Sequence, residues 1–132
     1  ARLLIIGYGQ FAGLGLEVAE KLAAEGVACC VADPIWCLPL SPELLRLASR
    51  YDLVVSIEDG LMAGGLGERL RAKLADHAPG VRMLAFGIEQ RFLSQGTRDE
   101  ILAELRLTSS DIARSVLEMV VRAQDLPAAQ PS

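Results

Sequence analysis

Two adjacent carboxylates and a run of glycines are the residues of this sequence whose types and spacing could do chemistry. Glu58 and Asp59 follow an apolar segment directly, and Gly64, Gly65 and Gly67 come soon after them. Two carboxylates can work as a general acid and a general base when they face one reacting group. Neighbouring residues at a strand end diverge, so we expect one carboxylate to cap the following turn or to pair with a partner domain.

The glycines of this loop let another surface approach the backbone closely. A helix that begins near Gly67 could hold a phosphate at its amino end. Glu58 and Glu68 would repel an anion at that position, as would the neighbouring aspartate. We therefore predict that the loop contacts another domain or subunit. Its candidate interface residues are Glu58, Asp59, Gly64, Gly65 and Gly67.

A second glycine motif follows the first apolar run of the chain. The stretch Gly7-Tyr8-Gly9-Gln10-Phe11-Ala12 matches G-x-G-x-x-A, and Asp33 stands at the end of the next apolar run. This spacing is that of a dinucleotide-binding turn whose acid binds a ribose hydroxyl. Glycines also serve a tight strand-to-helix turn for structural reasons alone. NAD binding therefore stays open beside the structural interpretation.

Cysteines and the single histidine offer little for catalysis or metal binding. Cys29 and Cys30 are adjacent in an apolar run, Cys37 follows, and His77 is the only histidine. A zinc site needs paired spacings and more ligands than these residues provide. We expect the cysteines to be small buried residues in a reducing compartment, and His77 to lie at a helix end. The sequence thus predicts no catalytic, cofactor-binding or metal-binding residue.

The elements that position these motifs alternate between short apolar runs and amphipathic stretches, which is typical of β-α units. We predict strands at residues 3–6, 27–32, 53–57 and 81–86. A first helix has Leu16, Ala19, Leu22 and Ala23 on one face and ends at Gly26. Further helices are predicted from the cap Ser41-Pro42-Glu43 to about residue 50, and over residues 67–78.

The last third of the sequence predicts a pair of helices and a tail. Thr97 to Glu100 and Thr108 to Asp111 both have the spacing of a capping box, which marks a helix start. Residues 125–132 contain two prolines and no apolar period, so we expect a flexible tail. The sum is an α/β domain over residues 1–124, a three-layer αβα architecture around an open, mostly parallel sheet.

Composition excludes several classes of function. The chain has 132 residues, 52% of them hydrophobic, and a net charge of −4 without a basic run, which disfavours nucleic-acid binding. No apolar run reaches the ~20 residues of a membrane span, and no signal-peptide pattern opens the chain. We expect a cytoplasmic protein without a membrane partner. Because Ala1 stands directly before the first strand, we expect a piece of a longer protein.

Three stretches carry a resemblance to a known family. A strand, two acids and then Gly64-Gly65-Leu66-Gly67 before a helix resemble the transketolase C-terminal domain. Residues 33–40 resemble the Asp/Asn-x-Arg-x-x-x-Pro-Leu segment of 1-deoxy-D-xylulose-5-phosphate synthases, with Ile35 in place of the usual arginine. Residues 91–105 are similar to that family's Phe-Ile-x-His/Gln-Gly/Ala-Ser-x-x-Glu-Leu-Leu-Ala-x-Leu segment.

The resemblance implies the last domain of a transferase that joins pyruvate to glyceraldehyde 3-phosphate with loss of carbon dioxide. That family serves isoprenoid, thiamine and pyridoxal biosynthesis, uses thiamine diphosphate and Mg²⁺, and forms homodimers. It implies that the cofactor sites lie in preceding domains, because this chain has no asparagine for their Gly-Asp-Gly…Asn motif. The chain alone is therefore expected to be inactive and to bind no cofactor. Arg91 is a candidate contact for a substrate phosphate, although a solvated or interfacial arginine is commoner.

Two further alternatives remain at this point. The chain could be a free-standing NAD-binding module. It could also be the C-terminal domain of a transketolase or of a 2-oxoacid dehydrogenase subunit, which would dock a carrier protein.

Overall fold

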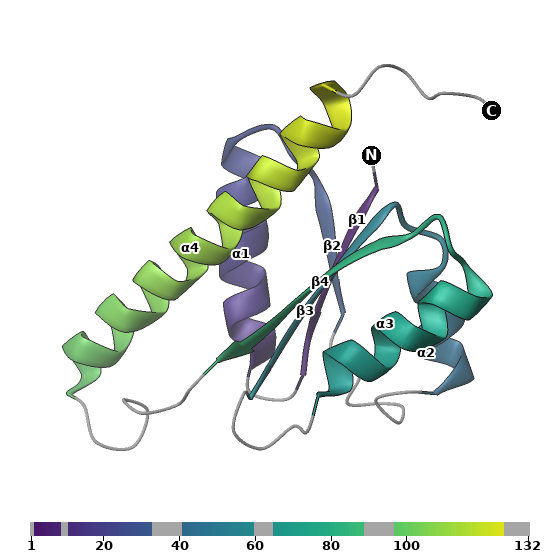
Figure 1. Ribbon diagram of the computed structural model, residues 1–132. Coiled ribbons are helices and arrows are strands. Elements are labelled where there is room, and N and C mark those ends of the chain that lie inside the picture. Colours follow the sequence, from purple (N-terminus) through teal and green to yellow (C-terminus); the bar gives the residue numbers. More distant parts are fainter. Residues whose placement is uncertain (1, 9–10, 33–40, 60–64, 89–96, 126–132) are drawn as a thin grey trace.

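A computed structural model describes residues 2–8, 11–32, 41–59, 65–88 and 97–125 of the chain. These residues form strands and helices in regular alternation (Figure 1). In chain order, the elements are β1 (Leu3–Gly7), α1 (Ala12–Ala24), β2 (Cys29–Ala32), α2 (Pro42–Ala48), β3 (Leu53–Asp59), α3 (Leu66–His77), β4 (Arg82–Ile88) and α4 (Arg98–Asp125). The predicted segments Asp33–Leu40, Gly64, Arg91 and the tail after residue 125 lie outside the described residues.

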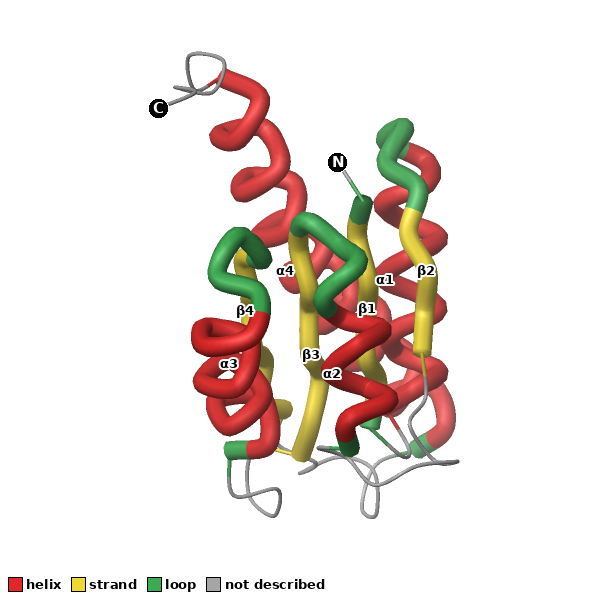
Figure 2. Tube along the Cα trace, turned by 90° about the vertical axis from the view of Figure 1, so that its right-hand side faces the viewer, coloured by secondary structure: helices red, strands yellow, loops and turns green. Residues whose placement is uncertain are grey.

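The four described strands form one parallel sheet in the order β2-β1-β3-β4. Helices α1 and α4 cover one face of this sheet, and α2 and α3 cover the other (Figures 1 and 2). The predicted three-layer αβα fold is therefore confirmed. The chain moves from β1 to β2 on one side and then crosses back to β3 on the other side of β1. The direction of winding thus reverses between β1 and β3.

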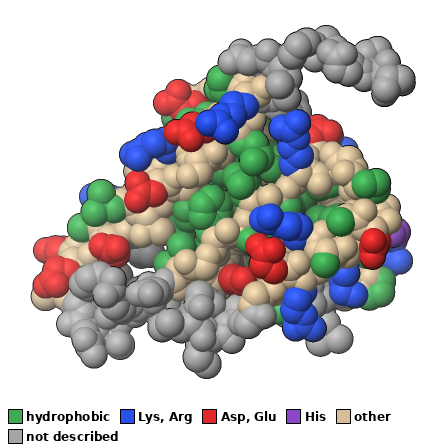
Figure 3. Space-filling view, viewed as in Figure 1, with side chains coloured by type: hydrophobic (Ala, Val, Ile, Leu, Met, Phe, Trp, Pro, Cys, Tyr) green, Lys and Arg blue, Asp and Glu red, His purple; other side chains and the backbone are tan. Residues whose placement is uncertain are grey.

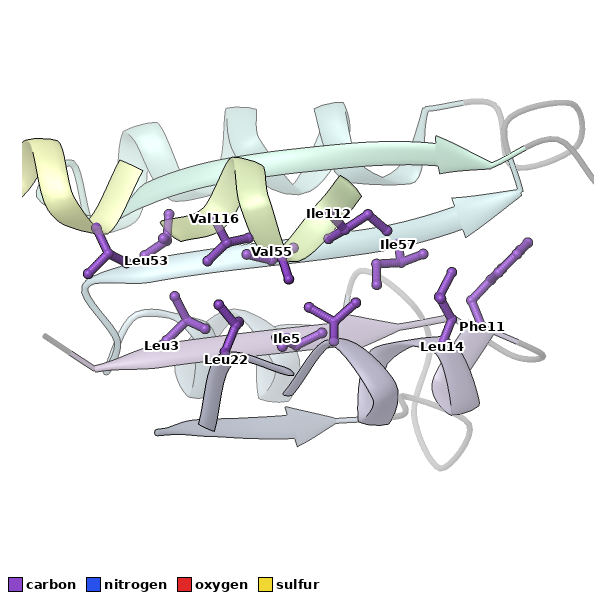
Figure 4. Packing of buried hydrophobic residues seen from close by; sticks show 13 residues of the cluster. Leu3, Ile5, Phe11, Leu14, Leu22, Leu53, Val55, Ile57, Ile112 and Val116 are labelled. Atoms are coloured by element: carbon purple, nitrogen blue, oxygen red, sulfur yellow. The ribbon is translucent and has the colours of Figure 1, made fainter. Parts of the chain in front are cut away.

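Alternate residues of the central strands supply two separate cores, because successive side chains of a strand point to opposite faces. On the first face, the strands meet the α1 and α4 helices (Figure 4). The buried residues of that core include Leu3, Ile5, Leu14, Val18, Leu22, Leu53, Val55, Ile57, Ile112, Val116 and Val120. On the second face, the core consists of Leu4, Ile6, Tyr8, Leu44, Ala48, Val54, Leu70 and Leu74.

The prediction of a helical pair at the C-terminal end is wrong, because α4 is one helix from Arg98 to Asp125. Its start is as predicted, since the Thr97 hydroxyl accepts a hydrogen bond from the Glu100 backbone N–H at 3.1 Å. The second capping box does not end the helix. The Ser109 hydroxyl donates to the Arg106 carbonyl at 3.0 Å, a bond within the helix that leaves its backbone ladder intact.

The predicted apolar face of α1 is partly wrong. Leu16 is 56% exposed, whereas Leu14, Val18 and Leu22 are buried. Residues spaced by four lie on one face of a helix, and the spacing from Leu14 to Leu22 places Leu16 on the outer side. The end of α1 is as predicted, because Gly26 has a left-handed φ of 83° just beyond it.

The two cysteines of strand β2 are less buried than the sequence predicted. The strand lies at an edge of the described sheet and begins at Cys29, two residues later than the strand predicted from the sequence. Cys29 is half-buried and Cys30 is exposed, so only one of the two is shielded from water. Burial raises the pKa of the Cys29 thiol to about 11, with a smaller contribution from neighbouring Cys30.

The remaining boundaries follow the sequence closely. The Ser41 hydroxyl caps α2 by accepting a hydrogen bond from the Leu44 N–H at 3.2 Å. Strand β3 continues past residue 57 and includes the backbone of Glu58 and Asp59. Among the described residues, no helix has the length and apolar composition that crossing a membrane requires.

Candidate functional site

Two sequence motifs meet where the winding of the sheet reverses. Gly7 ends β1 and lies opposite Ile57 of β3, one residue before Glu58. Because all described strands are parallel, their carboxyl ends lie at the same edge of the sheet. In open α/β sheets, ligands and partners bind in the crevice outside the carboxyl ends at this reversal point. Gly7 of the first motif and Glu58 of the second therefore lie at the ends of adjacent strands and define one candidate site.

The turn after β1 is tight for a structural reason. A Cβ atom on Gly7 would lie 2.5 Å from the Phe11 carbonyl oxygen and 2.7 Å from the Ala12 Cα, so only glycine fits. The backbone N–H of Tyr8 donates to the Ile57 carbonyl at 3.1 Å, which ties the turn to β3. The glycine at the start of the dinucleotide-like motif is thus explained by packing between β1 and α1. The other motif residues Gly9 and Asp33 lie outside the described part of the chain.

Glu58 is a buried carboxylate that caps α3. Its side chain is 7% exposed, and its two carboxylate oxygens lie 3.2 and 3.3 Å from the backbone nitrogen of Gly67. Gly67 is the second residue of α3, and its N–H has no partner within the helix. A carboxylate at this helix end also interacts favourably with the helix dipole. Of the two predicted roles, capping the following turn is the one that the described contacts display.

Gly67 lets α3 pack directly on the sheet. A Cβ atom there would lie 2.5 Å from the Ser56 hydroxyl oxygen and 2.8 Å from the Ala85 Cβ. Gly67 is buried, and both neighbouring residues belong to the sheet of the same domain. The lack of a side chain at Gly67 is therefore explained by packing inside the domain. The predicted interface role of Gly67 stays a prediction.

Gly65 has a different role at the start of α3. Its φ of 81° lies in the left-handed region, where residues with a side chain are strained. Its carbonyl accepts a hydrogen bond from the Arg69 N–H at 2.9 Å. Among the described residues, a Cβ atom on Gly65 would meet only the Glu68 Cβ, at an ordinary 3.9 Å, so these residues leave room for a side chain there. Gly65 is half-buried and remains a candidate interface residue.

The chemistry available at this edge is limited by Glu58. A phosphate at a helix amino end needs free backbone N–H groups, and the carboxylate already occupies the N–H of Gly67. The described residues contain no group of three or more His, Cys, Asp and Glu side chains that could hold a metal ion. The donor set at α3 therefore does not fit a Mg²⁺-bound diphosphate.

Sequence reasoning missed Ser56. This residue is fully buried in β3, and its hydroxyl has no hydrogen-bond partner within the described part of the structure. A polar residue in the middle of an apolar strand was the only available signal, since the close contact with Gly67 depends on how α3 packs. Gly64, Arg91 and the side chain of Asp59 lie outside the described part of the structure, so the predicted roles of these residues stay predictions.

Comparison with known proteins identifies the family. The model of the family described as "Transketolase, C-terminal domain" matches residues 1–112. The chain belongs to the transketolase C-terminal domain family. The parallel sheet with helices on both faces agrees with this membership, and so does the resemblance noted in the sequence.

Several curated relatives of this transketolase C-terminal domain share a name. A 1-deoxy-D-xylulose-5-phosphate synthase of Frankia casuarinae is 44% identical over 92% of this chain and 19% of its own length. Proteins of the same name from Clavibacter sepedonicus and Nocardia farcinica are 39% and 42% identical over 98% and 86% of this chain. They confirm the predicted resemblance to that synthase family. The chain spans about a fifth of the length of these relatives.

Proposed function

We propose that this chain is the C-terminal structural and interface domain of a 1-deoxy-D-xylulose-5-phosphate synthase. The observation that supports this proposal is the similarity of nearly the whole chain to synthases of that name, at 39–44% identity. The complete enzyme would condense pyruvate with glyceraldehyde 3-phosphate and release carbon dioxide. Its product would supply isoprenoid precursors, thiamine and pyridoxal. The protein would be cytoplasmic and would act as a homodimer.

Thiamine diphosphate and Mg²⁺ would be bound by domains outside this chain. The cofactor supplies carbanion chemistry when bound, and the protein around it supplies orientation. The described residues support this division of labour, because Glu58 occupies the amino end of α3, a helix end at the reversal point where a diphosphate could otherwise lie. The role of this chain would be to hold a rigid loop edge against its own N-terminal domains and a second subunit. The chain alone would have no synthase activity.

The contact would be made by the loop that includes Asp59, Gly64 and Gly65. Glu58 and Gly67 would support this loop from inside the domain, since both are buried where α3 packs on the sheet. The backbone carbonyl of Gly65 accepts a hydrogen bond from the Arg69 N–H, which fixes Gly65 at the start of α3.

The test is a synthase assay of the full-length protein beside the 132-residue chain. We expect the full-length protein to form 1-deoxy-D-xylulose 5-phosphate from pyruvate and glyceraldehyde 3-phosphate when thiamine diphosphate and Mg²⁺ are present. We expect the chain alone to form none, and to give no binding heat with the cofactor and Mg²⁺ in calorimetry. Ketol transfer between sugar phosphates, or acyl transfer to a lipoyl carrier, would instead show a transketolase or a 2-oxoacid dehydrogenase subunit.

A further inference from the structure

The outer edge of β4 is open in the described structure. The seven residues Arg82–Ile88 pair with β3 on one side, and no described strand lies on the other side. An open edge of a sheet presents unpaired backbone N–H and C=O groups that can pair with another extended segment. The sheet of this domain can therefore accept a further strand beside β4.

A groove of about 390 Å³ lies across the beginning of this edge. It is bounded on one face of the sheet by α3 and on the other by Met119 of α4. Figure 3 shows apolar side chains gathered between α4 and the β4 edge, with basic side chains beside them. The groove is lined by Arg71, Leu74, Ala75, Pro79, Val81, Arg82, Met83 and Met119.

The lining combines an apolar floor with positive charge. Arg82 is exposed and forms no ion pair with any described residue. Among the described residues, Arg71 pairs only with Glu68, at 3.6 Å between two solvent-exposed side chains, a contact of little energetic weight. The methionine side chains adapt readily to the shape of an incoming residue. Such a site favours a segment in which apolar residues are accompanied by carboxylates.

The register of β4 against β3 predicts which face of the sheet each side chain of such a segment would meet. Arg82 lies opposite Leu53 and so belongs to the α4 face, whereas Met83 lies opposite Val54 and belongs to the α3 face. A strand added to β4 would present successive side chains to these two faces in turn. One set would meet Arg82 and Met119, and the other would meet Met83 and Arg71.

We propose that the β4 edge and this groove bind an extended, carboxylate-bearing segment from the rest of the full-length polypeptide, which joins the sheet as an additional strand. This inference rests on the proposed function, because the relatives are about five times as long as this chain and supply the remaining polypeptide. A segment of the same molecule is present at high effective concentration, so modest contacts are enough to hold it. The two arginines select a negatively charged segment over a neutral one.

Hydrogen exchange followed by mass spectrometry tests this proposal on the full-length protein and on the 132-residue chain. We expect peptides covering Arg82–Ile88 to exchange about tenfold more slowly in the full-length protein, because pairing protects edge amides. The double variant Arg71→Glu/Arg82→Glu should remove that protection. The matched double variant Arg46→Glu/Arg114→Glu, which reverses two exposed arginines on other helices, should leave it unchanged.

Equal exchange rates in both proteins would overturn the proposal, while normal synthase activity of the full-length protein would leave the proposed function standing. Protection that survives reversal of both arginines would also overturn it. Protection in the 132-residue chain that grows with its concentration would show that a second copy occupies the edge. Slow exchange that needs both arginines, in a full-length protein without synthase activity, would support the docking edge and contradict the proposed function.

Discussion

Replacing Gly67 by alanine should destabilise the domain through a single methyl group. The new Cβ atom would lie 2.5 Å from the Ser56 hydroxyl oxygen and 2.8 Å from the Ala85 Cβ. The hydroxyl can rotate away, but the Ala85 Cβ is fixed to the backbone of β4, so α3 must move outward. Overpacking of this kind costs about 1–3 kcal/mol, and the helical preference of alanine returns up to ~1 kcal/mol. We expect a net loss of about 1–2 kcal/mol in the free energy of unfolding.

Thermal and urea unfolding of the chain measures this loss. At roughly 4 °C per kcal/mol for a domain of this size, the melting temperature should fall by about 4–8 °C. The control is Gly13→Ala, because Gly13 is likewise the second residue of its helix, and a Cβ atom there would have no described neighbour within 4 Å. That variant should gain about 0.5 kcal/mol. If both variants shift stability equally, the close packing of α3 on the sheet is not a constraint and the reasoning is refuted.

Three further predictions follow from described contacts. Glu58→Gln should lower the free energy of unfolding by about 1–2 kcal/mol in urea, because the α3 cap loses its charge, whereas the exposed Glu43→Gln should change it by less than ~0.5 kcal/mol. At pH 8, Cys29 should react with iodoacetamide about a hundredfold more slowly than an ordinary thiol of pKa 9.0, because burial raises its pKa to about 11; equal rates in peptide mapping would contradict this. The raised pKa also means that the stability contributed by the neutral thiol is present below pH 9 and lost as pH rises through about 11. NAD(H) should not bind at Gly7, whose close contact with Ala12 already explains the glycine, and saturable binding in a fluorescence titration would show a dinucleotide site.

The sheet and its helices could be predicted because local patterns and packing agree in this part of the chain. The apolar run of β1 and the mostly apolar run of β3 are typical of strands buried on both faces, and both strands lie at the centre of the described sheet. Ser41 starts a helix as its type and position predict. The burial of the edge strand β2 was harder to predict, because its apolar residues are only partly covered at the edge of the described sheet.

The errors arose where local signals conflicted with packing. Thr108 to Asp111 has the composition of a helix start, but the apolar stripe of Ile112, Val116 and Val120 packs on the sheet as part of one longer helix. Packing of that stripe outweighs a cap worth only about 1 kcal/mol. The apolar stripe of α1 was likewise predicted to begin at Leu16, whereas the buried stripe begins at Leu14. Leu16 was therefore wrongly placed on the inner face of the helix.

The candidate site was located by sequence, but its internal contacts were not. Strand-end acids and glycines identified the loop around residues 58–67, and the parallel order of the strands brought it beside Gly7. The pairing of Glu58 with Gly67 depends on where α3 lies over the sheet, which no local pattern determines. The same holds for Ser56, because its buried hydroxyl leaves no space for a side chain at Gly67 of α3.

The interface role of the loop is tested most directly by adding a side chain to Gly65 in the full-length protein. Asparagine tolerates the left-handed backbone of Gly65, where a Cβ atom meets, among the described residues, only the Glu68 Cβ at 3.9 Å. The matched control is Gly26→Asn, since Gly26 has nearly the same φ of 83° and lies beyond the end of α1, where a Cβ atom has no described neighbour within 4 Å. Sedimentation and synthase turnover of both variants should show weakened assembly and lower turnover for Gly65→Asn alone. An intact dimer with normal turnover in both would contradict the interface role of this loop.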